Sequence, residues 1–343
     1  MPRPILVTGA SGFVALHAIT QLLQQGYKVR ATLRTLSREA EVREAIGRHV
    51  EVGDNLEIVS ADLTQDSGWD KIVEGCESVL HVASPFPLLE PKDESELITP
   101  AVQGTLCVLR AAHDANIKRV VIVSSVAAVS SGHNGENRTF DENDWSDVGK
   151  DIGAYAKSKT LAERAAWDFI NGSENKNKME LVTINPPLIL GPVPNKDLPT
   201  SAEMVSTLML GQVPGVARMK VGIVDVRDVA SALILAMTTP EAAGHRFICP
   251  AGTVWLKDLA ETLHEKYAAH GYKIHTLQFP VFAVRLLALF DKKIARVVGD
   301  LEWDFEFSDE KIKRILKWTP RPMEEAILSM ADSLIEQGLV KTS

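Results

Sequence analysis

Cysteine is scarce in this chain, and its distribution excludes a disulfide framework. The three cysteines, Cys76, Cys107 and Cys249, are far apart and stand in apolar surroundings. An odd number of isolated, apolar cysteines is typical of buried thiols in a reducing compartment, so we expect a cytoplasmic protein. No group of cysteines and histidines has the spacing of metal ligands, so no metal is expected.

Long hydrophobic runs and a surplus of positive charge are also absent. The longest apolar helix candidate, residues 281–290, is interrupted by Arg285 and is far shorter than the ~20 residues that span a bilayer, so we expect it to pack against the protein core. The N-terminus leads almost at once into an apolar strand, which leaves no room for a signal peptide. The 37 basic and 45 acidic residues give a net charge of −8 without a polybasic tail. Neither a nucleic acid nor a membrane is therefore an expected partner.

What the sequence does contain is a regular alternation of strands and helices. Short apolar runs at 5–7, 27–33, 56–59, 78–83, 119–123 and 180–184 are separated by helical patterns. This alternation predicts an α/β fold, a Rossmann-type doubly wound parallel sheet, over residues 1–192. From residue 193 prolines punctuate short elements, including a brief strand at 246–249, which predicts a smaller C-terminal substrate lobe over 193–343. An apolar segment at 222–240 is expected to return to the first domain.

A glycine-containing turn follows the first apolar run. Its pattern is Gly9-x-x-Gly12-x-x-Ala15, with a helix expected from residue 13 to about 25. Glycines allow a sharp turn and close approach of a ligand, and the N-terminus of a helix favours a diphosphate. The alternative is a tight strand–helix connection without a ligand.

Arginine stands where the second strand ends. This is the position at which an acidic residue would bind the adenosine ribose of NAD, but the sequence has Arg34, with Arg38 four residues on and no acid from 28 to 38. Two guanidinium groups suit a 2′-phosphate, so the pattern favours NADP(H). The alternative is a pair of solvated surface arginines. Asp62, just past the third strand, could accept a hydrogen bond from adenine or cap the next helix.

Three polar residues form a candidate catalytic group. Tyr155 and Lys159 are four apart on a predicted helix, so they lie on one face, and the ammonium group is expected to lower the pKa of the phenol. Such a phenol can exchange a proton with an alcohol oxygen, and Lys159 can reach the nicotinamide ribose. Ser125 ends the fifth strand and can donate to a carbonyl oxygen. Alone, Tyr155 and Lys159 could be an exposed helix pair, but with Ser125 and the glycine turn they indicate one site.

These motifs together resemble the extended short-chain dehydrogenase/reductase superfamily, and within it the dihydroflavonol-4-reductase-like branch of aldehyde, methylglyoxal and ketone reductases. The stretches that carry the resemblance are 8–15, 81–86, 123–125, 155–163 and 185–192. The resemblance implies that Ser125, Tyr155 and Lys159 are catalytic. The cofactor contacts that it implies, with Arg38 added from the charge pattern, are Gly9, Ser11, Gly12, Phe13, Val14, Arg34, Arg38, Asp62, Leu63, Val82, Ala83, Ser84, Tyr155, Lys159, Pro186, Pro187 and Leu188.

The substrate pocket is expected to be largely apolar. Beside Ser125 and Tyr155 it should lie between Phe86, Val126, Pro187, Met204 and Val205, although Phe86 could equally anchor an ordinary loop. The segment 224–230 has an aspartate where the superfamily often has histidine, so the substrate cannot be transferred by analogy.

The expected activity is that of an NADPH-dependent carbonyl reductase, which converts aldehydes or ketones to alcohols. The alternatives are an NAD-dependent nucleotide-sugar epimerase or dehydratase, a hydroxysteroid dehydrogenase, and a cofactor-sensing regulator without chemistry. The expected partner is a small carbonyl or alcohol substrate, and the expected assembly is a monomer or homodimer.

Overall fold

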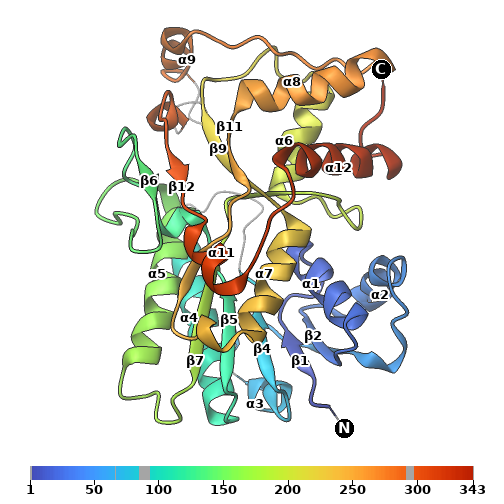
Figure 1. Ribbon diagram of the computed structural model, residues 1–343, viewed down its shortest axis with the longest axis vertical. Coiled ribbons are helices and arrows are strands. Elements are labelled where there is room, and N and C mark those ends of the chain that lie inside the picture. Colours follow the sequence, from blue (N-terminus) through green and yellow to red (C-terminus); the bar gives the residue numbers. More distant parts are fainter. Residues whose placement is uncertain (1, 66, 85–92, 291–296, 343) are drawn as a thin grey trace.

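The computed structural model describes residues 2–65, 67–84, 93–290 and 297–342 (Figure 1). Within these residues a parallel sheet of seven strands has the order β10-β7-β5-β4-β1-β2-β3. The order reverses beside β1, so the predicted doubly wound Rossmann-type sheet is confirmed. The strands are β1 (Ile5–Val7), β2 (Val29–Leu33), β3 (Leu56–Ser60), β4 (Ser78–His81), β5 (Arg119–Val123), β7 (Glu180–Asn185) and β10 (Arg246–Ile248).

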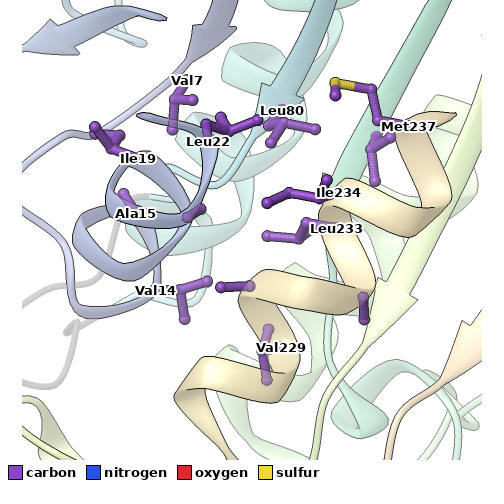
Figure 2. Close-up of a cluster of buried hydrophobic side chains, with 14 of the residues drawn as sticks. Val7, Val14, Ala15, Ile19, Leu22, Leu80, Val229, Leu233, Ile234 and Met237 are labelled. Atoms are coloured by element: carbon purple, nitrogen blue, oxygen red, sulfur yellow. The ribbon is translucent and has the colours of Figure 1, made fainter. Parts of the chain in front are cut away.

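Helices cover both faces of this sheet. On one face α1 (Phe13–Gln24) packs against α7 (Val226–Thr238), with α2 (Glu39–Gly47) beside them, as Figure 2 shows for the side chains between α1 and α7. On the other face α4 (Ser95–Asp114) packs against α5 (Gly153–Asn171) and α3 (Trp69–Val73). Alternate strand residues supply the two cores: Val7 and Leu80 face α1 and α7, whereas Leu6 and Val79 face α4. Burial on both sides explains why these strands read as continuous apolar runs.

The upper lobe in Figure 1 has its own sheet and core. Strand β9 (Lys220–Asp225) lies between β8 (Leu188–Leu190) and β11 (Gly252–Trp255). The helices around it are α6 (Thr200–Met209), α8 (Leu256–Tyr267) and α12 (Met323–Glu336), and α12 packs against the other two. Short 3-10 turns lie at Leu36–Arg38, Gly53–Asn55, Val126–Ala128, Pro240–Ala242, Ala268–His270 and Val298–Asp300.

Several elements from the second half of the chain lie in the main body. Strand β10, which we expected in the lobe, pairs in parallel with β7 at the edge of the main sheet. Helix α11 (Glu310–Leu316) contacts β10 and α7. Strand β12 (Glu306–Phe307) pairs in parallel with β6 (Thr139–Phe140), which lies in sequence between Ser125 and Tyr155. The last 40 residues thus contact both parts of the molecule.

Helix α9 (Val281–Leu287) does not pack as its sequence led us to expect. Val284 is buried, but Phe282 and Leu286 are exposed, as are Leu289 and Phe290 just beyond the helix. The helix presents one narrow side to the protein, because it projects from the upper lobe (Figure 1). None of the helices in the described ranges is long and apolar enough to cross a membrane.

Candidate active site

A cleft of about 1110 Å³ opens at the carboxyl ends of the main strands, between the sheet and the lobe. It gathers segments that are far apart in the sequence. The predicted site residues that line it are Gly9, Ser11, Gly12, Phe13, Val14, Arg34, Arg38, Asp62, Leu63, Val82, Ala83, Ser84, Ser125, Val126, Tyr155, Lys159, Pro186, Pro187 and Leu188. Both the predicted cofactor residues and the predicted catalytic group therefore share one cavity.

The glycine turn forms one end of this cleft. Gly9 has φ +75°, and a Cβ built there would lie 2.8 Å from the Cβ of Ala83, so the turn can approach β4 only because the residue is glycine. Helix α1 follows Gly12, which as the N-cap residue has no side chain to cap it, so the amides of the first turn are available to an anion. The cradle therefore fits the diphosphate of a dinucleotide.

Thr8 holds the two strand ends beneath the cradle at a fixed separation. Its Oγ1 accepts hydrogen bonds from the amides of Val82 and Ala83, both at 3.0 Å. With its lone pairs engaged, the hydroxyl donates to Nδ1 of His81 at 2.9 Å. The ends of β1 and β4 are thus joined through one threonine.

Ser125 and Tyr155 are hydrogen-bonded to each other in the middle of the cleft. Ser125 Oγ also accepts from the amide of Ala127 at 3.1 Å, and the Lys159 ammonium lies 5.9 Å from the centre of the Tyr155 ring. Tyr155 is 40% exposed and lines the cleft, so a substrate in the cleft can contact it. A hydroxyl, a phenol and an amine beside a dinucleotide cradle can polarise and protonate a carbonyl oxygen.

The pKa values of this group differ from the sequence prediction. The pKa of Tyr155 is raised, because its place in the cleft disfavours the phenolate and the hydrogen bond with Ser125 only partly offsets this. Desolvation lowers the pKa of Lys159 to about 8, opposed by the nearby carboxylate of Glu163. The expected lowering of the phenol pKa by Lys159 was wrong for this structure, because desolvation has the largest effect on the pKa of Tyr155 and raises it. Tyr155 therefore holds its proton until a stronger base develops next to it.

Comparison with known proteins shows the family to which the chain belongs. Residues 5–249 match the NAD dependent epimerase/dehydratase family. The chain belongs to this family. It is 34% identical to a putative anthocyanidin reductase of Ginkgo biloba (90% of this chain, 91% of the relative) and 32% identical to a ketoreductase of Aspergillus niger (98% and 99%). The solved structure of yeast methylglyoxal/isovaleraldehyde reductase complexed with NADPH is similar, with a TM-score of 0.82 and 28% identity over 98% of this chain and all of the other.

These similarities confirm the resemblance drawn from the motifs. The family is that of the extended short-chain dehydrogenases/reductases, and the relatives include dihydroflavonol 4-reductases. The chain is therefore an oxidoreductase.

Both predicted arginines lie at the end of the cleft where the adenosine of the cofactor is expected, but they differ in their partners. Arg38 is bidentate to Glu41, with both distances 3.0 Å, and it pairs with Asp197 of the lobe at 2.8 Å. Arg34 is exposed on the cleft, and none of the ion pairs among the described residues includes it. Arg34 is thus ready to meet an anionic group, whereas Arg38 already has two carboxylate partners. Asp62 accepts from the amide and hydroxyl of Thr64, which lowers its pKa, so it stabilises a local turn at the cleft edge and does not cap α3, whose N-cap is Gly68.

The predicted substrate residues are divided by the structure. Val126 and Pro187 line the cleft, but Met204 and Val205 do not. Val205 is fully buried in the core of the lobe and Met204 packs against the same core, because α6 turns this face toward α12. Phe86 lies outside the described residues.

The cleft is lined instead by three aromatic residues that the sequence analysis did not predict, which we call the aromatic wall. Trp303, Phe305 and Phe307 line the cleft from the segment that enters β12, and neighbouring ring centres are 4.3 and 5.2 Å apart. A Cβ at Gly222 would lie 3.0 Å from the Phe307 ring, so the ring can pack here only because residue 222 is glycine. The alternation of aromatic residues at 303, 305 and 307 is the signal that could have indicated one buried strand face.

Two histidines near the cleft are held neutral and should make the protein sensitive to acid. Burial lowers the pKa of His81 to about 3, with a further contribution from the charge of Lys159, and burial lowers that of His17 to about 4. Their folded-state pKa values lie below the unfolded value of 6.5, so stability is complete above pH 6.5 and is lost as the pH falls toward 3 or 4.

Urea unfolding at pH 7 and pH 5 measures this loss. Each neutral histidine should account for about 2 kcal/mol of the difference in unfolding free energy, because the unfolded chain takes up the proton. In His81→Asn the difference between the two pH values should shrink by that amount, whatever the variant's stability at pH 7. Equal stability of the wild-type protein at both pH values would contradict the assignment.

Proposed function

We propose that this protein is an NADPH-dependent carbonyl reductase that converts an aldehyde or a ketone to the alcohol. The observation that carries the proposal is the hydrogen-bonded pair Ser125 and Tyr155, with Lys159 beside it, in the same cleft as the glycine turn. The cofactor is NADP(H): the similar yeast reductase is complexed with NADPH, and Arg34 stands free at the adenosine end.

Each of the three polar residues has a different role in the reduction of the carbonyl group. Bound NADPH supplies the hydride to the carbonyl carbon. Ser125 donates a hydrogen bond to the carbonyl oxygen and orients it. Tyr155 donates its proton to that oxygen as negative charge builds up there, and the nearby ammonium of Lys159 stabilises the phenolate that remains.

The rival activities use the same three residues on other substrates. A nucleotide-sugar epimerase or dehydratase has to hold a second diphosphate at the substrate end, but that end has the aromatic wall, and its Lys220 is already paired with Asp304 and Glu306. This favours an uncharged carbonyl substrate. A hydroxysteroid dehydrogenase would run the same chemistry toward the ketone, so it differs in substrate and direction.

Spectrophotometric screening tests the proposal. NADPH and NADH are each assayed with a panel of aldehydes and ketones, NADP⁺ and NAD⁺ are each assayed with steroid alcohols, and the purified protein is analysed for bound nucleotide. We expect NADPH to be consumed with aldehydes or ketones. Stoichiometric NAD that persists through purification, without turnover of any carbonyl, would refute the proposal in favour of an epimerase.

Replacement of Arg34 by serine should weaken discrimination for NADPH over NADH. A charge-assisted hydrogen bond contributes about 1.5–3 kcal/mol, so we expect KM for NADPH to rise roughly 10- to 100-fold while KM for NADH stays nearly constant. Arg38→Ser is the matched control and should have the smaller effect, because Arg38 is shared with Glu41 and Asp197. If KM rose equally for NADPH and NADH, Arg34 would not bind the 2′-phosphate.

A further inference from the structure

Glu163 is a buried carboxylate one helical turn beyond Lys159 on α5. It is only 2% exposed, and a buried charge is tolerated only when it is paired and fully hydrogen-bonded. The mechanism above does not use this residue, yet its partners on other elements are Ser124 just past β5, Thr183 and Asn185 in β7, and Arg246 in β10.

The two oxygens of Glu163 face different parts of the molecule. Oε2 faces the catalytic centre, where it accepts from Ser124 Oγ at 2.5 Å and from Asn185 Nδ2 at 2.7 Å, with a longer contact from Arg246 Nη2 at 3.5 Å. Oε1 faces the sheet edge, where it accepts from Thr183 Oγ1 at 2.9 Å and from Arg246 Nε at 2.7 Å, and it also accepts from Trp167 Nε1 on α5 at 3.3 Å. One side chain thus ties the helix to three strands.

The partners of Oε2 connect directly to Ser125. Ser124 precedes it in the chain, and Asn185 Nδ2 also donates to the carbonyl oxygen of Ser125 at 3.1 Å. We propose that Glu163 is a positioning residue, which holds the strand end bearing Ser125 at the distance from α5 that lets Ser125 meet Tyr155. The inference rests on the proposed function, because it assigns Glu163 a role in the geometry of that same site.

Arg246 holds the carboxylate in place. Besides the ion pair, its Nη1 donates to the carbonyl oxygens of Glu142 and Asp144, and its guanidinium stacks 3.7 Å over the Trp145 ring. Arg246 can only donate, so a glutamine at 163 would have to keep its oxygen toward Arg246. The amide NH₂ would then face Ser124 and Asn185. Asn185 could accept from it only by turning its own NH₂ away from Ser125.

The test compares Glu163→Gln with Glu142→Gln, and each with Ser125→Ala. Glu142 is also buried, and its Oε1 accepts from the amide of Ile248, but it has no bond to the strand end at 124–125. Loss of an aligned donor to a developing oxyanion costs about 10²–10³ in kcat, so a misplaced Ser125 should cost roughly 10- to 100-fold. We expect that loss in kcat for Glu163→Gln, with KM for NADPH within about twofold of wild type, and no loss for Glu142→Gln.

A double-mutant cycle separates positioning from general damage. If Glu163 acts through Ser125, the variant that carries both Glu163→Gln and Ser125→Ala should be no slower than Ser125→Ala alone. Additive losses, or a wild-type kcat in Glu163→Gln, would overturn the proposal. Ser124→Ala removes one hydrogen bond to Oε2 and leaves the ion pair between Arg246 and Glu163 intact. This variant replaces Glu163→Gln in the test if Glu163→Gln does not fold. An unchanged kcat in Ser124→Ala would contradict the positioning role of Glu163.

A crystal structure of the variant without cofactor gives a readout that does not depend on turnover. We expect the Ser125 hydroxyl to have moved out of hydrogen-bonding distance of Tyr155 in Glu163→Gln, and to remain there in Glu142→Gln. A wild-type protein without carbonyl turnover would refute the proposed function alone. An unmoved Ser125 would refute the positioning role alone.

Discussion

Replacement of Tyr155 by phenylalanine should abolish most carbonyl reduction and leave NADPH binding unchanged. A positioned general acid contributes about 10²–10⁴ in rate, and the variant keeps the ring and loses only the proton donor. Ser125 still orients the carbonyl oxygen, but no phenol remains to supply the proton. We expect kcat to fall by that factor, as measured by NADPH absorbance, with the dissociation constant for NADPH unchanged in a fluorescence titration.

Tyr267→Phe is the matched control for loss of a hydroxyl. The Tyr267 hydroxyl donates to Asp332 at 2.8 Å in the lobe, and the residue lies in the lobe's core. Its removal should lower the unfolding free energy by about 1–2 kcal/mol without altering kcat. Full turnover in Tyr155→Phe would remove the proposed acid and with it the mechanism.

Gly9→Ala should damage both stability and NADPH binding. The alanine would adopt φ +75°, which costs roughly 1–2 kcal/mol, and its Cβ would lie 2.8 Å from the Cβ and 3.2 Å from the Cα of Ala83. Because one of these neighbours is backbone, the turn has to shift, at a further cost of about 1–3 kcal/mol. The shift opens the cradle at which the first-turn amides of α1 meet the diphosphate, so we expect at least a tenfold rise in the dissociation constant for NADPH.

Gly26→Ala separates the two contributions. Gly26 has φ +82°, but a Cβ there would meet nothing within 4 Å. This variant should show only the conformational cost in urea unfolding, and NADPH should bind as it does to the wild type. If Gly9→Ala matched Gly26→Ala in both measurements, close approach to Ala83 would not be what requires glycine at position 9.

Local patterns were enough to predict the sheet, the cradle and the catalytic group. The apolar runs have a physical cause that lies within each strand, namely burial on both faces, and the spacing of Tyr155 and Lys159 depends only on the helix between them. Ser125 could be predicted because the ends of parallel strands meet at one edge of the sheet.

The errors concern contacts between distant segments. The partner of Arg38 in the lobe, Asp197, is 159 residues away, and the aromatic wall around Trp303 follows Tyr155 by nearly half the chain. Val205 was misplaced because an amphipathic helix does not specify which neighbour its apolar face meets. The direction of the Tyr155 pKa was wrong because it depends on desolvation by walls that other segments supply.

The pairing of β6 with β12 has a consequence for synthesis on the ribosome. Strand β6 is translated before Tyr155, but its partner emerges more than 160 residues later. Strands β1 to β5 have by then all been translated, so the nucleotide cradle can assemble first, as N-terminal units do during translation. The aromatic wall of the cleft is therefore completed after the cradle, and a nascent chain halted before residue 303 would hold the cradle without this wall.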